Sequence, residues 1–378
     1  MLNGELDLRA DFVQMFPDKR VTISDTIEAL ATIGGGAWEV VDDRSTATVT
    51  RVTIQAPGSR RYDIAYRSVG DTYGMFVAMP RSVDEASVGE AKVGYSIAHL
   101  GESGCEQLAG ENSDDRFPVS SVSKLAVVGA TLDAVEAGWL RMDDQLEIHA
   151  QDRSLPSGTW HTLPVGAKRS VAEAMSAALH SSDNTANDLL IRAVGRASVH
   201  DFAVNLLGHD PELPFLTTVE LFKLSWSADT ELRSRFVSGD FQERLTILVE
   251  DVPTLPMPVL DYDEEPVEHL QIQWFGRPDA LCAVWAVLLA DSRWDELVEP
   301  LMAPPEFELQ GWHSLGHKAG YAPGNRGFSG VAELDCGEIV SYSGAVAFGD
   351  AGLDVESAFY LANILSNESL AVEETVCG

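Results

Sequence analysis

Residues 117–124 read Phe-Pro-Val-Ser-Ser-Val-Ser-Lys, and this stretch decides the fold of the larger part of the chain. A helix is predicted to begin within it, with Ser120 as the N-cap residue. Apolar side chains then repeat at intervals of three and four over residues 125–135, and Gly138 is placed to end the helix. The pattern predicts a buried helix that starts at a cluster of serines.

Ser121 and Lys124 in this stretch have the chemistry of a nucleophile and its base. A serine in the first turn of a helix lies near backbone N–H groups and the positive end of the helix dipole. A lysine whose pKa is lowered by burial can remove the serine proton for acyl transfer. Ser-x-x-Lys is also common by chance, with the serine starting a helix and the lysine in solvent, so the pair needs further support.

Two further motifs follow in chain order: Ser-Asp-Asn at residues 182–184 and Lys-Ala-Gly at residues 318–320. With Ser-x-x-Lys, this set resembles the serine β-lactamase and penicillin-binding-protein superfamily. The resemblance covers about residues 93–378, and the flanks at 117–121 and 171–190 are similar to those of class A β-lactamases. It implies an α+β fold with a helical cluster and an antiparallel sheet.

The resemblance implies a role for each motif residue. Ser121 would be the acylated nucleophile, Lys124 its base or part of its proton relay, and Ser182 the donor of a proton to the leaving group. The N–H groups of Ser121 and Tyr321 would form the oxyanion hole. The remaining substrate-binding residues would be Asn184 on the substrate amide, Lys318 on a substrate carboxylate, and Ala319 and Gly320 beside it.

Two departures from the family pattern bear on the reaction. Ala319 stands where a hydroxyl residue is usual, which argues against a strict preference for β-lactams. Glu220 is the nearest candidate for the glutamate that activates the deacylating water in class A enzymes, but Leu224 occupies the position of the accompanying asparagine. Thr217 and Glu220 have the spacing of a capping box before an apolar run, which explains the glutamate without catalysis. We therefore expect slow hydrolysis of a β-lactam acyl-enzyme.

The domain organisation is predicted as residues 1–85, a small α+β domain, and residues 86–378, the serine hydrolase domain. The first is expected to hold a helix near 23–30 and strands within 47–55, 61–66 and 74–79. With Lys-Ala-Gly, this architecture is similar to the bidomain group that includes LpqF and Cpe, the β-lactamase-like protein of clavulanic-acid clusters. That resemblance implies a cystatin- or steroid-isomerase-like first domain and esterase-type activity.

Charge and composition restrict the partners. The 378 residues include 26 basic and 59 acidic side chains, so the net charge of −33 opposes binding to nucleic acid or anionic lipid. The longest apolar run, 280–290, is too short to span a bilayer and predicts a buried helix. Residues 1–8 lack the features of a secretory signal, so we expect a cytoplasmic protein, or an exported one if an upstream signal is missing. No cofactor is implied, because acyl transfer needs only side chains and backbone dipoles. No metal is implied either, because the four cysteines have no metal-ligand spacing.

The function predicted from these observations is a serine hydrolase that forms an acyl-enzyme at Ser121. Its substrate would be a small ester or a β-lactam-like amide, with weak or no β-lactamase turnover. Two alternatives remain open: a binder of β-lactam-like ligands that serves biosynthesis, and a D-alanyl peptidase. The sequence leaves the oligomeric state, the disulfide status and the role of the first domain undetermined.

Overall fold

A computed structural model describes residues 91–155, 157–258, 270–294, 311–322 and 324–347, together with isolated residues between 297 and 378. It also describes the backbone of five strands between residues 21 and 80. The expected helix near 23–30 and the expected domain boundary at residue 85 lie outside the described residues. The domain division therefore stays a prediction.

The strands before residue 80 form one antiparallel sheet in the order β1-β5-β4-β3-β2. Three of them, β3 (Val49–Gln55), β4 (Arg61–Val69) and β5 (Thr72–Pro80), confirm the strands predicted within 47–55, 61–66 and 74–79. Sequence analysis missed β1 (Val21–Thr22) and β2 (Glu39–Asp43). The latter has acidic residues at both ends and little alternation, so its strand character comes from pairing with β3.

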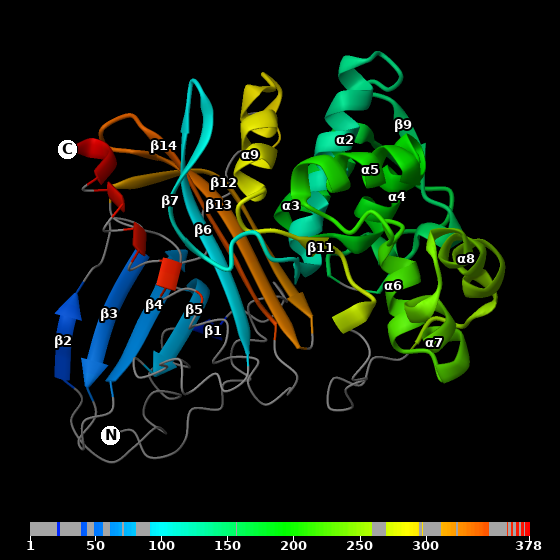
Figure 1. Ribbon diagram of the computed structural model, residues 1–378, viewed down its shortest axis with the longest axis horizontal. Helices are drawn as coiled ribbons and strands as arrows, with labels where there is room; N and C mark the ends of the chain where they lie inside the picture. Colours follow the sequence, from blue (N-terminus) through cyan, green and yellow to red (C-terminus); the bar gives the residue numbers. More distant parts are fainter. Residues whose placement is uncertain are drawn as a thin grey trace.

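A second five-stranded antiparallel sheet has the order β12-β13-β14-β6-β7, so the last three strands of the chain pair with the first two of this region (Figure 1). Its strands are β6 (Lys92–Gly101), β7 (Gly104–Glu111), β12 (Trp312–Ala322), β13 (Asn325–Leu334) and β14 (Ile339–Ala347). The turns between these strands contain Gly324 and Gly337, whose φ values of +79° and +88° glycine adopts without strain. β12 is an outer strand, and this places the Lys-Ala-Gly motif at a sheet edge.

Helices α2 to α9 gather on one side of this sheet, and α9 lies between the sheet and the rest of this group (Figure 1). Their bounds are α2 (Lys124–Glu136), α3 (Val171–His180), α4 (Asn184–Val194), α5 (Arg196–Phe202), α6 (Thr218–Ser225), α7 (Thr230–Ser238), α8 (Phe241–Thr246) and α9 (Leu281–Ala290). Two short antiparallel strand pairs lie in the segments that connect these helices. They are β8 (Phe117–Pro118) with β11 (Phe275–Gly276), and β9 (Gln145–Glu147) with β10 (Lys168–Ser170). An α+β fold of helices and an antiparallel sheet is thus confirmed.

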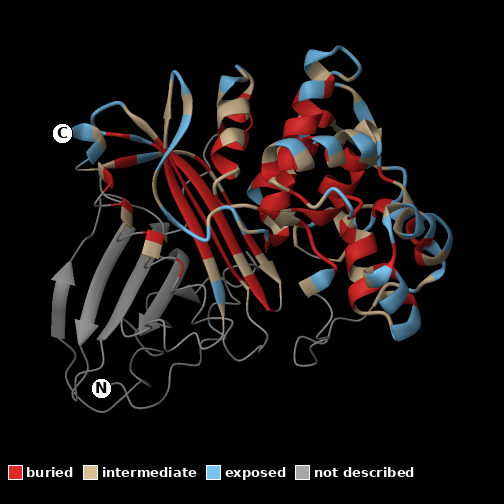
Figure 2. Cartoon of the chain, viewed as in Figure 1, coloured by how far each residue is buried: buried red, intermediate tan, exposed pale blue. Residues whose placement is uncertain are grey.

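The core lies around α2, which is apolar on nearly all sides and therefore buried (Figure 2). A Cβ on Gly129 would meet the ring of Phe202 at 2.2 Å, so α5 can approach α2 only because residue 129 has no side chain. A second cluster covers the other face of the sheet and includes Phe328, Tyr342 and Leu361. The Ser-x-x-Lys motif thus lies at the start of the helix around which the core is built.

Two disulfides join segments that are distant in the sequence. Cys105 on β7 is bonded to Cys282 on α9, and Cys336 in the β13–β14 turn is bonded to Cys377 near the end of the chain. The sequence offered no pattern that would select these pairs. Among the described residues, no helix is long and apolar enough to cross a bilayer.

Candidate active site

The nucleophile segment is a 3-10 turn, Ser120–Ser123, that leads directly into α2. Sequence analysis was wrong about Ser120, because its side chain does not cap the helix. The Ser120 hydroxyl lies 2.5 Å from Oδ1 of Asn325 at the start of β13, and Ser120 has a φ of +46°. A left-handed serine is strained, and the surrounding structure must hold it. The hydrogen bond from Ser120 to Asn325 links the residue before Ser121 to the sheet.

Lys124 lies at the centre of the site. Its Nζ is 3.1 Å from Ser121 Oγ, 3.0 Å from Ser182 Oγ, 2.5 Å from the carbonyl oxygen of Ser182 and 2.7 Å from Asn184 Oδ1. The fold therefore brings the first and second motifs together around one amine. The side chain is 1% exposed, which contradicts the picture of a solvated lysine.

Burial lowers the pKa of Lys124 well below its usual value, and the positive charge of Lys318 lowers it further. The carboxylates of Asp183 and Asp188 oppose this effect. A neutral amine has two N–H groups and one lone pair. The two N–H groups match the acceptor oxygens of the Ser182 carbonyl and the Asn184 amide, which leaves the lone pair for a serine hydroxyl.

The Ser-Asp-Asn motif is fixed by its middle residue, which sequence analysis did not single out. Asp183 is the N-cap of α4 and accepts a hydrogen bond from the N–H of Ala186 at 2.9 Å. Its second oxygen accepts from the N–H groups of Thr159 at 2.7 Å and Trp160 at 2.8 Å. Ser182 has a φ of +51°, so this network holds a strained residue beside Lys124.

Asn184 is held on both sides of its amide. Its Oδ1 accepts from Lys124, while its Nδ2 donates to the carbonyl oxygen of Leu155 at 3.0 Å. The orientation of the amide is therefore set by the 154–160 segment. An Nδ2 proton remains for a ligand, as the predicted contact with a substrate amide requires.

The Lys-Ala-Gly motif lies on β12, directly against the nucleophile turn. A Cβ added to Gly320 would lie 2.2 Å from the carbonyl oxygen of Val119 and 2.9 Å from the backbone nitrogen of Ser121. Only glycine allows this approach, so the strand backbone meets the Ser121 N–H at close range. The predicted oxyanion hole requires this juxtaposition.

Lys318 faces the same side of β12 as Gly320 and is 5% exposed. Burial lowers its pKa to about 7, and its Nζ donates to the carbonyl oxygen of Ala319 at 2.9 Å. Ala319 itself is exposed. The site thus contains two buried lysines whose charges repel each other.

Tyr321 and Arg326 face each other across β12 and β13, on the sheet face that also carries Ala319. The Arg326 guanidinium lies 3.4 Å from the centroid of the Tyr321 ring, a cation–π contact. Sequence analysis missed Arg326, because nothing in the sequence predicts the register that brings it opposite Tyr321.

Glu220 is fully engaged in structural contacts. It closes the predicted capping box of α6, since Thr217 N donates to its Oε2 at 2.8 Å and Glu220 N donates to Thr217 Oγ1 at 3.1 Å. Arg196 also binds both carboxylate oxygens, at 2.8 and 2.5 Å. The capping role is confirmed, and the ion pair with Arg196 explains the burial of this glutamate.

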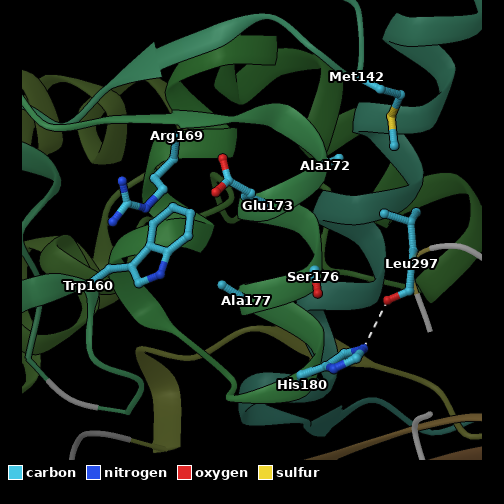
Figure 3. Close-up of a pocket in the computed structure, with 9 residues that line it drawn as sticks. All are labelled: Met142, Trp160, Arg169, Ala172, Glu173, Ser176, Ala177, His180 and Leu297. Carbon is cyan, nitrogen blue, oxygen red and sulfur yellow. Dashed lines mark hydrogen bonds between the residues drawn. The ribbon is translucent and has the colours of Figure 1, made fainter. Parts of the chain in front are cut away.

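A cavity of about 490 Å³ lies beside α3 and not at the motifs (Figure 3). Its walls include the Trp160 ring with Arg169 above it at 5.7 Å, and His180, which bonds the Leu297 carbonyl oxygen at 2.9 Å. Within the described residues, no group of three metal-ligating side chains could hold an ion.

Known proteins resemble this chain over part of its sequence and in its fold. Residues 81–235 match the Beta-lactamase enzyme family. Beta-lactamase VEB-1 of Pseudomonas aeruginosa is 28% identical over 109 residues, a match that spans 28% of this chain and 35% of that enzyme. A β-lactamase from Sphaerobacter thermophilus has a similar fold, with a TM-score of 0.53 at 20% identity over 78% of this chain and 96% of its own. One from Chitinophaga pinensis has a TM-score of 0.52 at 17% identity, over 76% and 98%.

The fold is therefore that of the serine β-lactamases. The family match covers the part of the chain that carries the Ser-x-x-Lys and Ser-Asp-Asn motifs, and the two solved structures share its fold.

Proposed function

We propose that this chain is a serine acyl-transfer enzyme in which Ser121 is the nucleophile and Lys124 its base. The observation that carries the proposal is the position of the Lys124 amine, buried and within 3.1 Å of the hydroxyl oxygens of both Ser121 and Ser182. A buried amine in this place, with its pKa lowered, can exchange a proton with either hydroxyl.

The reaction follows from these contacts. The Lys124 lone pair takes the Ser121 proton while Oγ attacks the substrate carbonyl carbon. The developing oxyanion receives hydrogen bonds from the N–H groups of Ser121 and Tyr321. The proton then passes from Lys124 through the Ser182 hydroxyl to the leaving group, and the carbon–leaving-group bond breaks. The product is an ester between Ser121 and the acyl group.

The substrate we propose is a small ester or a β-lactam-like amide that carries a carboxylate. Lys318 and Arg326 supply positive charge on either face of β12, next to the exposed Ala319. A guanidinium at this place can bind a carboxylate without the hydroxyl that Ala319 lacks. Asn184 Nδ2 would bind the substrate amide oxygen.

Release of the acyl group is the step that the site supports least. The Glu220 carboxylate is occupied by Arg196 and by the Thr217 N–H, so it is not available to activate water. We therefore propose weak or no β-lactamase turnover, and we base the proposed esterase-like activity on the resemblance to the Cpe and LpqF group. The same observation favours a second candidate, a protein that is acylated once by a β-lactam-like ligand and retains it.

The Lys-Ala-Gly motif and the separate sheet before residue 80 support placement in the bidomain Cpe and LpqF group. We also propose that the chain folds in an oxidising compartment, because two disulfides join its described cysteines. This favours export over the cytoplasmic location.

The experiment that tests the function mixes the purified protein with a chromogenic ester and a chromogenic cephalosporin, and follows product release and intact mass. Ser121→Ala is the control. Steady ester turnover that is lost in the variant supports the hydrolase. A stable mass increase at Ser121 without turnover supports the second candidate, and no labelling by either compound would refute both.

A further inference from the structure

Ser157 lies on the 154–160 segment, and its hydroxyl group reaches the Ser-Asp-Asn motif. The side chain is half-buried, and the hydroxyl donates to the carbonyl oxygen of Ser182 at 2.5 Å. The same oxygen accepts from Nζ of Lys124 at 2.5 Å. One carbonyl oxygen therefore binds both the proposed base and a second donor, which takes no part in the proposed reaction.

The backbone around Ser157 holds the hydroxyl in this place. The carbonyl oxygen of Ser157 accepts from the N–H of Asn184 at 3.2 Å. The next residue, Gly158, has a φ of +77°, and a Cβ on it would lie 2.1 Å from Oδ2 of Asp183. Only glycine allows this approach. Residues 157 and 158 are therefore packed directly against the motif.

The two donors share the lone pairs of the Ser182 carbonyl oxygen. Such an oxygen has two lone pairs, and the Ser157 hydroxyl takes one of them. A hydrogen bond from a charged donor is about twice as strong as one from a neutral donor, so the Lys124 ammonium ion gains more from this oxygen than the neutral amine does. Sharing the oxygen therefore weakens the stabilisation of the ammonium ion more than that of the amine.

The other charged groups that face Lys124 come from two elements. Lys318 on β12 lowers the pKa of Lys124, and Asp183 and Asp188 on α4 raise it. The pKa of Asp188 is itself raised to about 7 by burial, so its charge also changes near neutral pH. These groups are the same in every variant of Ser157, so a difference between such variants comes from residue 157.

We propose that Ser157 is a positioning residue of the acylation site, whose hydroxyl holds the Ser182 carbonyl oxygen and takes one of its lone pairs, so that Lys124 is kept as a neutral base. This inference rests on the proposed function. The hydrogen bond also fixes the carbonyl group of Ser182, a residue with a φ of +51°. Loss of the hydroxyl leaves the oxygen to Lys124 alone, which favours the ammonium ion.

The test compares Ser157→Ala with Ser157→Thr, which keeps the hydroxyl, and with the control Ser198→Ala. Ser198 on α5 is also half-buried, and its hydroxyl donates at 3.0 Å to the carbonyl oxygen of Val194, which lies outside the three motifs. The readout is the rate of Ser121 acylation by a neutral chromogenic ester, measured by intact mass between pH 5 and 10. A neutral ester keeps the binding of a carboxylate by Lys318 out of the profile. Thermal unfolding shows that each variant is folded.

We expect the midpoint of the rise in acylation rate with pH to move upward by roughly half to one pH unit in Ser157→Ala, the size of one neutral hydrogen bond. The higher pKa of Lys124 leaves less neutral amine at a given pH. Acylation should therefore be about three- to tenfold slower below the midpoint and within twofold of the wild type on the plateau. Ser157→Thr and Ser198→Ala should keep the wild-type midpoint.

A merely structural role of Ser157 would slow acylation by the same factor at every pH. That result would overturn the inference, as would a wild-type midpoint in Ser157→Ala or a midpoint that stays shifted in folded Ser157→Thr. In each of these cases the wild type is still acylated, so only the positioning role is wrong. If the wild type is not acylated at Ser121 at any pH, the proposed function is wrong and the positioning role falls with it.

Discussion

Gly320→Ala tests the close approach of β12 to the nucleophile turn. The added Cβ would lie 2.2 Å from the Val119 carbonyl oxygen, and ordinary contact begins at about 3.4 Å. The strand must therefore retreat by roughly 1 Å, and a misplacement of that size in a reacting geometry costs about a hundredfold in rate. Overpacking should also lower the free energy of unfolding by about 1–3 kcal/mol.

The assay for Gly320→Ala is the rate of Ser121 acylation by a chromogenic ester, with thermal unfolding measured in parallel. Gly101→Ala is the matched control, because its Cβ would meet the flexible ring of His99 at 3.0 Å at the end of β6. We expect the control to acylate at the wild-type rate. If folded Gly320→Ala acylates within threefold of the wild type, the argument that the β12 backbone forms part of the site is refuted.

Four further predictions follow from the contacts of the site. Lys124→Met should lower the acylation rate by about 10²–10⁴-fold, since it removes the base, and a rate within tenfold of the wild type in stopped-flow assays would argue against that role. The acylation rate should rise with pH as Lys124, whose pKa is lowered, loses its proton. Above pH 7 Lys318 also loses its proton, so kcat/KM for a carboxylate-bearing substrate should fall relative to kcat/KM for a neutral ester. Equal pH profiles for the two substrates would exclude Lys318 from carboxylate recognition. Glu220→Gln should lower the free energy of unfolding in urea by about 1.5–3 kcal/mol, because its hydrogen bonds to Arg196 join charged groups. The deacylation rate should stay unchanged. A hundredfold slower deacylation would instead make Glu220 the base that activates water. Reduction of the Cys105–Cys282 disulfide, which spans 177 residues, should cost up to about 5 kcal/mol, and an unchanged unfolding midpoint with reductant would contradict this.

Local patterns predicted much of the fold. The strands β3, β4 and β5, the buried helix α9 and the capping box at Thr217 were all predicted, because each depends on residues close in sequence. The Ser120 N-cap was wrong, since a partner on β13, 205 residues away, competes for its hydroxyl. The local capping preference of a serine is overridden where its hydroxyl forms a stronger tertiary contact.

For the candidate site, too, some residues could be predicted from the sequence and others could not. The sequence alone indicated Ser121, Lys124, Ser182, Asn184 and Lys318, because their residue types and order carry the resemblance. It could not indicate Asp183, Asn325 or Arg326, whose roles follow from the register of strands and the packing of helix ends. The two disulfide pairings were equally inaccessible.

What the sequence determined by itself is the chemistry available to this protein: two serines, two lysines and an amide in a fixed order along the chain. What the tertiary structure decided is the state of those groups. Burial lowers the pKa of Lys124, and two acceptor oxygens take its N–H groups, because helices α2 and α4 meet at this point. Desolvation depends on everything that surrounds a group, so no stretch of sequence contains it.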